Sequence, residues 1–310
     1  MKKILLFAAS IALIFALLTC VWIYFPKSEC FYQDYLFGAI DDCERLKNTS
    51  GEKRFILLGG SSLGFSVSAE KLSEKLGKPV INLGVHAGIG FKNIWKIYRK
   101  CLSPDNDVII LSPEYGMVEQ IDDHSKQYCQ IVFLQRDINE LANCPECTLD
   151  ISKYTLEDIR NLFLKKKNTD DIYYRNAFNA YGDVVSHYHL NNRSFVVNET
   201  FPIKQDKMED YVNFVDKEIS AKGFKVIYIP TIVPESMRRN YFEMVSFQTF
   251  MINHFSAGER LNTSDLFFPD KYFFNTIYHM NVAGMQRKTG LFFKKLKSNP
   301  KYDSKAMASR

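Results

Sequence analysis

Two serines in a glycine-rich turn are the first candidates for chemistry. Ser61 and Ser62 lie in the segment GGSSLG at residues 59–64, directly after an apolar run that ends at Leu58. A serine placed between a buried strand and a helix has small neighbours that let an acyl carbonyl approach, and the N–H groups that follow it can stabilise an oxyanion. The segment therefore predicts a nucleophilic serine, although the same residue types are also common in ordinary turns.

A histidine far along the chain is the second candidate. His279 lies in the segment YFFNTIYHMNVAG at 272–284, where the predicted sheet ends and just before a predicted final helix. Imidazole is the side chain whose ordinary pKa suits proton transfer near neutral pH. We therefore expect the fold to bring His279 to the serine hydroxyls.

The elements between these residues alternate between strands and helices. Apolar runs predict strands at 54–58, 79–82, 108–111 and 225–230, and helical spacing predicts helices at 68–77, 91–101, 205–221, 235–254 and 282–297. Ser68 is suited to cap the first of these helices and Gly77 to end it. The alternation predicts an α/β fold, a three-layer α/β/α sandwich with a mostly parallel sheet, whose site lies at the carboxyl ends of the strands.

The N-terminal segment predicts a membrane anchor. An apolar run at 4–25 follows Lys2 and Lys3 and ends in aromatic residues, and about 20 apolar residues span a bilayer. A cleaved signal peptide and a lipidated Cys20 are the alternatives, because the short basic start and the segment LLTC at 17–20 resemble those signals. The two lysines predict a cytoplasmic N-terminus and a periplasmic or extracellular location from residue 26 onward.

The rest of the chain predicts one domain with an insertion. We expect an anchor at 1–25, a connector at 26–52, an α/β domain at 53–298 with an insertion at about 117–200, and a tail at 299–310. The net charge of +5 is scattered, apart from the lysines at 165–167 and a basic C-terminal helix. This distribution argues against nucleic-acid binding, and both clusters are typical of solvated faces rather than of phosphate-binding patches.

Cysteine usage agrees with an oxidising compartment. Six of the seven cysteines follow the predicted anchor, which suggests disulfides without choosing a pairing: Cys30, Cys43, Cys101, Cys129, Cys144 and Cys147. The pair in the motif CPEC at 144–147 is expected to form a local disulfide or to remain as inert thiols. Half of a zinc site or a redox pair is the alternative, but the sequence offers no second such motif and no convincing fourth ligand.

Taken together, these segments resemble the SGNH/GDSL hydrolase superfamily, particularly its membrane-anchored relatives that modify cell-surface polysaccharides, such as the alginate and teichoic-acid acylation proteins. The resemblance covers most of 54–115 and 223–296. The residues GGS at 59–61 resemble the first block, Gly-Asp-Ser, with Gly60 in place of the aspartate, and the spacing of FSVS at 65–68 favours Ser61 over Ser62. The segment NLGVHAG at 82–88 resembles the second block, which implies that Gly88, or Gly84 as the alternative, donates an N–H to the oxyanion.

The last two blocks of the family are matched less closely. The segment YHMN at 278–281 resembles the final block and implies that His279 is the general base. The aspartate expected three or four residues earlier is replaced by Thr276 or Asn275, so Asn275 is the expected orienting group and Asp270 the alternative. Glu114 falls near the place of the third block's oxyanion-donating asparagine, where a carboxylate would repel an oxyanion unless it points away or is protonated.

The resemblance implies a serine esterase or O-acyltransferase that acts on extracytoplasmic glycan or another acyl ester without a cofactor. For a transferase, a multispanning membrane acyltransferase would be the donor partner. The alternative is an SGNH-like scaffold or glycan-binding component without catalysis. Two weaker hypotheses are a metal site at Asp183, His187 and His189, and a glycosidase pair of Glu114 with Asp122 or Asp123.

Overall fold

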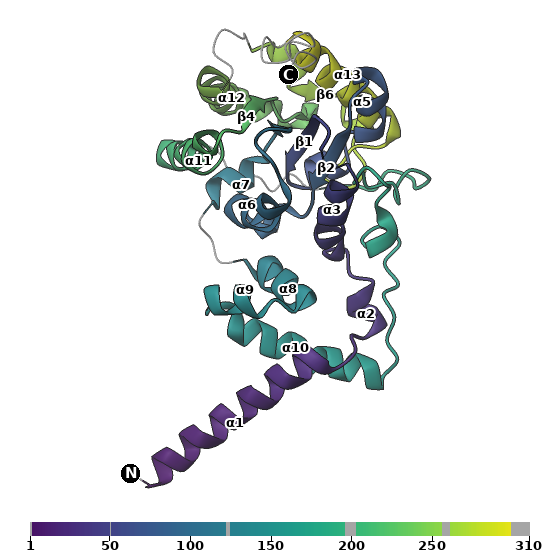
Figure 1. The fold of residues 1–310 in the computed structure, drawn as a ribbon. Coiled ribbons are helices and arrows are strands. Elements are labelled where there is room, and N and C mark those ends of the chain that lie inside the picture. Colours follow the sequence, from purple (N-terminus) through teal and green to yellow (C-terminus); the bar gives the residue numbers. More distant parts are fainter. Residues whose placement is uncertain (1, 50, 122–124, 196–202, 256–260, 299–310) are drawn as a thin grey trace. The chain divides into compact units, whose positions relative to one another are not determined.

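The structure, a computed structural model, describes residues 2–49, 51–121, 125–195, 203–255 and 261–298. Figure 1 shows the fold as a ribbon whose colours follow the sequence from the N-terminus to the C-terminus. The chain divides into two compact units, of which the smaller contains Met1–Ile40 and His124–Ala177 and the larger contains Asp41–Asp123 and Phe178–Arg310.

A four-stranded parallel sheet forms the centre of the larger unit. Its strand order is β2-β1-β3-β4, with β1 at Arg54–Gly59, β2 at Val80–Gly84, β3 at Asp107–Leu111 and β4 at Lys225–Tyr228. Every residue of β1, β2 and β3 is buried, as expected for strands of a covered parallel sheet. The predicted α/β class with a mostly parallel sheet is confirmed.

One face of the sheet packs against helices α5 (Ala69–Leu76) and α13 (Val282–Ser298). Strand residues such as Leu57 and Ile110 share a buried cluster with Leu72 of α5 and Phe292 of α13. Local sequence sets the bounds of α5 as predicted, because the Ser68 hydroxyl accepts a hydrogen bond from the Lys71 N–H and Gly77 adopts the left-handed conformation at φ 63°.

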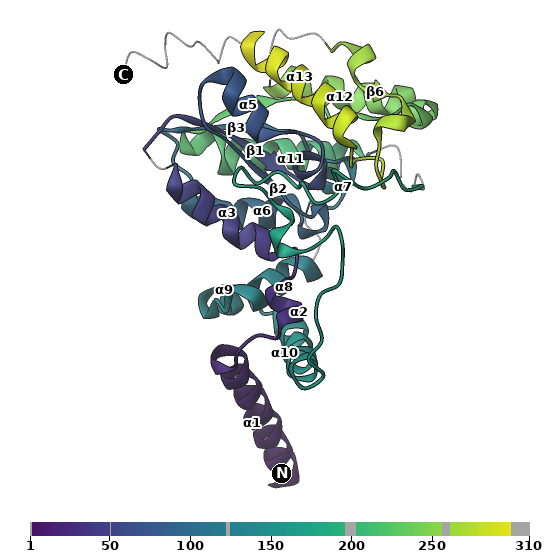
Figure 2. The same cartoon turned by 90° about the vertical axis from the view of Figure 1, so that its right-hand side faces the viewer.

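The other helices of the larger unit include α6 and α11, which pack against each other, and the short helices α4 and α7, which follow β1 and β3. Trp95 of α6 packs edge-on against Phe224, and Phe91 of the same helix contacts Tyr211 of α11. Figure 2 shows α6 on the side of the sheet away from α5 and α13. The helices with their bounds are α4 (Ser61–Gly64), α6 (Phe91–Tyr98), α7 (Tyr115–Glu119), α11 (Gln205–Glu218) and α12 (Tyr241–Phe255).

A buried ion pair and a disulfide stabilise the amino-terminal edge of the sheet. The Arg54 guanidinium donates to the Asp107 carboxylate at 2.6 Å, and both side chains are almost fully buried. Close by, Cys43 forms a disulfide with Cys101. The strand β1 is thus tied to β3 by side chains as well as by the backbone ladder.

The smaller unit is helical and includes the apolar N-terminal helix. It contains α1 (Lys2–Tyr24), α2 (Glu29–Tyr32), α8 (Lys126–Gln135), α9 (Ile138–Asn143) and α10 (Cys147–Phe163). Helix α1 is long and apolar enough to cross a membrane. Its last turn belongs to the packed unit, because Trp22 is 3% exposed and its indole N–H donates to the Phe133 carbonyl at 2.8 Å.

The observed units differ from the predicted connector at 26–52 and the predicted insertion at about 117–200. Residues 26–40 belong to the smaller unit together with 1–25 and 124–177, whereas 178–195 belongs to the larger unit. Helix α3 (Phe37–Asn48) runs from one unit into the other. Residues 299–310, the predicted tail, lie outside the described residues.

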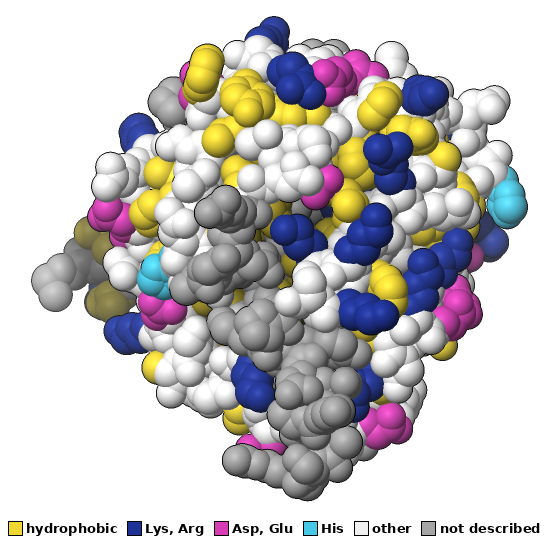
Figure 3. Space-filling view, turned by 90° about the horizontal axis from the view of Figure 1, so that it is seen from above, with side chains coloured by type: hydrophobic (Ala, Val, Ile, Leu, Met, Phe, Trp, Pro, Cys, Tyr) yellow, Lys and Arg dark blue, Asp and Glu magenta, His cyan; other side chains and the backbone are white. Residues whose placement is uncertain are grey.

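The surface charge has no single continuous basic face in the view of Figure 3. Lys and Arg side chains gather on one half of that face, with hydrophobic and acidic side chains between them. Two exposed ion pairs of the described surface, between Lys222 and Glu218 and between Arg238 and Glu235, are local contacts along the chain.

Candidate active site

Ser61 stands where the sequence predicts a nucleophile. It is the first residue of α4, directly after β1, with Gly60 as the N-cap residue. Its side chain is half-buried, and its hydroxyl donates to Glu114 Oε1 at 3.1 Å. This is the position at the carboxyl end of a central strand that open α/β folds use for ligands.

Glu114 points at the predicted nucleophile instead of away from it. It follows β3 and precedes α7, is 5% exposed, and its Oε1 also accepts the Ser62 N–H at 2.7 Å. Its carboxylate thus lies beside Ser61, where the sequence resemblance implies an oxyanion donor. A Cβ at position 60 would meet this carboxylate and the sulfur of Met117, so the glycine leaves room for the observed position of Glu114.

His279 is held in a fixed orientation. Its Nδ1 lies 2.9 Å from Asn275 Oδ1, the partner that the sequence predicts, and its ring stacks on Phe65 with centroids 3.9 Å apart. An amide oxygen only accepts, so Nδ1 carries the proton and Nε2 the basic lone pair. Burial lowers the pKa of His279 to about 3, with smaller contributions from His187 and other nearby basic groups.

Hydrogen bonds on both sides of His279 tie it to the serine-bearing segment. The Ser66 hydroxyl donates to the Tyr278 carbonyl at 2.6 Å and accepts the Met280 N–H at 3.0 Å. Phe65, which stacks on the imidazole, is the residue that caps α4, one helical turn after Ser61. The structure thus brings His279 to the serine turn, but among the described residues the hydroxyl of Ser61 bonds to Glu114 and not to His279.

A buried lysine completes the polar cluster, and the sequence reasoning missed it. Lys288 of α13 is fully buried, and its Nζ donates to the Ser62 carbonyl at 3.0 Å. Burial lowers the pKa of Lys288 to about 7, although the Glu114 carboxylate acts to raise it. The signal was available, since Lys288 shares the helical spacing of the buried Met285 and Phe292.

The two glycines expected to supply an oxyanion donor have engaged N–H groups. Gly88 donates to Nδ1 of His86 at 3.0 Å in an exposed turn, and Gly84 donates to Oδ1 of Asn82 at 3.0 Å. Gly84 also lies against α4 so closely that a side chain there would collide with the Gly64 backbone. Gly84 therefore has a packing role, whereas the N–H of Gly88 is near the surface.

Asp183, His187 and His189, the residues of the predicted metal site, have different surroundings in the structure. Both carboxylate oxygens of Asp183 accept N–H groups at the start of α5, and Oδ1 also accepts Asn82 Nδ2 at 2.9 Å. His187 lies 2.9 Å from the Met280 carbonyl and its pKa falls to about 4 because of burial, whereas His189 is exposed. These three side chains do not form a metal-binding group among the described residues.

Two alternatives remain from the sequence, Asp270 as the orienting group and a glycosidase pair that includes Glu114. Asp270, the substitute for the orienting group, accepts the Ser236 N–H at 3.0 Å in an exposed position. The glycosidase hypothesis paired Glu114 with Asp122 or Asp123, which lie outside the described residues.

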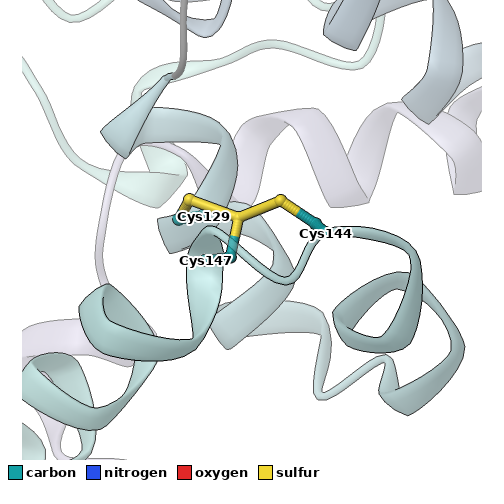
Figure 4. A group of neighbouring side chains, drawn as sticks. All are labelled: Cys129, Cys144 and Cys147. Carbon is teal, nitrogen blue, oxygen red and sulfur yellow. A yellow bond between two sulfur atoms is a disulfide. The ribbon is translucent and has the colours of Figure 1, made fainter.

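Three cysteines of the smaller unit form a separate buried cluster. The sulfur of Cys147 lies at bonding distance from those of both Cys129 and Cys144 (Figure 4). A sulfur atom forms one disulfide at a time, so either pairing leaves a third thiol beside the bond. All three sulfurs lie within 4.8 Å of one another, and the group contains no fourth His, Cys, Asp or Glu among the described residues. The local Cys144–Cys147 pair predicted from the sequence thus has a third neighbour that the spacing did not reveal.

Comparisons of this chain with protein-family models, with curated proteins and with solved structures gave no match.

Proposed function

We propose that this protein is a membrane-anchored serine esterase or O-acyltransferase of the SGNH type that acts on an extracytoplasmic acyl ester, such as an acylated glycan. The observation that carries the proposal is the pairing of His279 with Asn275 beside the turn that bears Ser61. The nucleophile and the base come from opposite ends of the larger unit's sequence, and Ser66 links the two segments.

The proposed chemistry is acyl transfer through Ser61. The hydroxyl oxygen of Ser61 attacks the acyl carbon while its proton passes to Nε2 of His279, and the alcohol of the ester leaves with that proton. Water then releases the acyl group in an esterase, whereas an acceptor hydroxyl receives it in a transferase. Asn275 holds the tautomer, but without a charge it stabilises the imidazolium less than an aspartate does.

Glu114 makes the observed arrangement a resting state in this proposal. Its carboxylate accepts the Ser61 hydroxyl and the Ser62 N–H, so it occupies the space in which an oxyanion would develop. A negative charge there opposes the transition state. The proposal therefore requires Glu114 to turn away or to take up a proton when the ester binds.

The fold and the N-terminal helix support two further parts of the proposal, the three-layer sandwich and the membrane anchor. Helix α6 and the pair of α5 and α13 lie on different sides of the sheet in Figure 2, which supports a three-layer sandwich. Helix α1 would anchor the chain with its N-terminus in the cytoplasm and the larger unit in the periplasm or outside the cell. For a transferase, a multispanning membrane acyltransferase would supply the acyl group, an expectation that rests on the family resemblance alone.

A fluorophosphonate probe tests the nucleophile directly. We expect the full chain in detergent to be labelled at Ser61 and to hydrolyse p-nitrophenyl acetate. The Ser61→Ala variant should lose both, and the matched Ser62→Ala variant should keep both, because the Ser62 hydroxyl is buried without a hydrogen-bond partner among the described residues. Equal turnover by the Ser61→Ala protein would refute the assignment.

A second function, an SGNH-like scaffold or glycan-binding component without catalysis, is favoured by the same carboxylate. An acidic group that accepts both the Ser61 hydroxyl and the Ser62 N–H occupies that N–H and repels a developing oxyanion. A folded chain that resists labelling, even after Glu114→Gln removes the charge, would support the scaffold over the enzyme.

A further inference from the structure

Helix α10 of the smaller unit carries an exposed face that mixes large apolar and basic side chains. Leu149, Leu156 and Phe163 recur at intervals of seven residues and are 64%, 57% and 80% exposed. Between them on the same face lie Lys153 and Arg160, both exposed. The opposite face, which includes Ile151, is buried in the unit. Large side chains rarely stand exposed in such a row on a soluble surface.

The same helix lies at the end of the apolar helix α1. The two helices are in contact, and Figures 1 and 2 show α10 crossing the end of α1 instead of continuing its direction. Side chains also fix the end of α1 to α8, which packs against α10, since the indole of Trp22 donates to the Phe133 carbonyl and Arg136 donates to the carbonyls of Ile23 and Phe25. Tyr24 at this end is 81% exposed, as in the aromatic belt of a membrane helix.

We propose that the exposed face of α10 lies on the membrane into which α1 inserts and binds its anionic lipid headgroups. This inference rests on the anchoring proposed above and not on the chemistry of Ser61. An interfacial helix buries its apolar side chains at the boundary of the acyl chains while its lysines and arginines extend to the phosphates. Helix α10 presents both kinds of side chain on one face, beside the point where the chain leaves the membrane.

The charges near the end of α10 match an anionic surface. Exposed lysines at 165–167 follow directly after the helix, and one of them, Lys167, lies 3.4 Å from the exposed Glu29. On the helix itself, Glu157 is exposed as well, and Lys153 bonds to Asp150. Basic side chains therefore outnumber acidic ones on this surface, and each basic residue near an anionic membrane contributes roughly 1 kcal/mol of attraction.

Quenching of an added tryptophan by brominated lipid tests the inference. The full chain is placed in phosphatidylcholine vesicles with or without phosphatidylglycerol, with bromine on the acyl chains. Phe163→Trp is compared with the control Phe242→Trp, which alters an 82% exposed position of the larger unit, and the emission of Trp22 and Trp95 in the unaltered chain is subtracted. We expect the tryptophan at position 163 to lose most of its added emission and the one at 242 to keep it.

The dependence on lipid charge gives the second readout. Phosphatidylglycerol should increase the quenching at position 163, and Lys165→Gln combined with Lys166→Gln should reverse that increase. Quenching at 163 no greater than at 242 overturns the inference, and quenching that ignores phosphatidylglycerol overturns the assignment to anionic headgroups. Resistance of the chain to extraction by alkaline carbonate tests the anchor separately, so a failure of the α10 surface is distinguished from a failure of α1 to insert.

Discussion

The buried lysine of α13 leads to a prediction about stability and pH. Lys288 is fully buried, and its pKa of about 7 lies far below the ordinary value of 10.5 because burial penalises the ammonium form. Below pH 7 both the folded and the unfolded chain hold the proton, so the folded protein carries the full penalty. As the pH rises from about 7 to 10.5, the folded chain loses the proton first, and the free energy of unfolding increases.

The size of this increase follows from the two pKa values. A slope of about 1.4 kcal/mol per pH unit between 7 and 10.5 gives a total on the order of 5 kcal/mol. Lys288→Met keeps most of the side-chain volume and removes the titrating group. It also leaves the Ser62 carbonyl without its 3.0 Å donor, which costs about 1–3 kcal/mol at every pH. We therefore expect the variant to be the more stable protein below pH 7 and to lose that advantage near pH 10.

Urea unfolding of the full chain in detergent, followed by the fluorescence of Trp95, measures this effect between pH 6 and 10. The difference between the unaltered chain and Lys288→Met isolates the lysine, because all other titrating groups are common to both. Stability curves that run parallel across this pH range would refute the reasoning about the buried amine.

Two further predictions concern the proposed reaction at Ser61. Glu114→Gln removes a charge next to the developing oxyanion and keeps the size of the side chain, so fluorophosphonate labelling of Ser61 should rise roughly 10- to 100-fold; slower labelling would show that the carboxylate assists the serine. Because burial lowers the pKa of His279 to about 3, its imidazole stays neutral well below pH 6, with the lone pair of Nε2 unprotonated. The labelling rate should then be unchanged between pH 8 and 5, and a loss with a midpoint near 6.5, measured on the Glu114→Gln protein, would contradict the buried state of the base.

The strands and helix ends could be predicted because their signals are local. Apolar runs that end in glycine became β1 and β2, and Ser68 and Gly77 set the ends of α5 as expected. The hydrogen-bond partner of His279 could also be predicted, since Asn275 lies four residues earlier in the same segment. In each case neighbouring residues alone determine the geometry.

The features that could not be predicted depend on contacts between distant segments. Nothing in the segment LSPEY at 111–115 indicates that Glu114 would turn toward Ser61, because the groups that bond its carboxylate, the Ser61 hydroxyl and the Ser62 N–H, lie in a distant segment of the chain. The pairing of residues 1–40 with 124–177 is likewise a long-range choice made by packing. The sequence allows Asp183 as a metal ligand, but its carboxylate instead accepts the N–H groups at the start of α5.

The bridge made by Ser66 has a consequence for how the protein matures. Its hydroxyl joins residues separated by 212 and 214 positions, so the imidazole reaches the serine turn only after nearly the whole larger unit has been synthesised and folded. Contacts of such long sequence separation form late and slowly, because the loop between them must close first. Under the proposed function, an incompletely synthesised chain therefore has the Ser61 turn without its imidazole, and reactivity at Ser61 would begin only when the finished fold assembles.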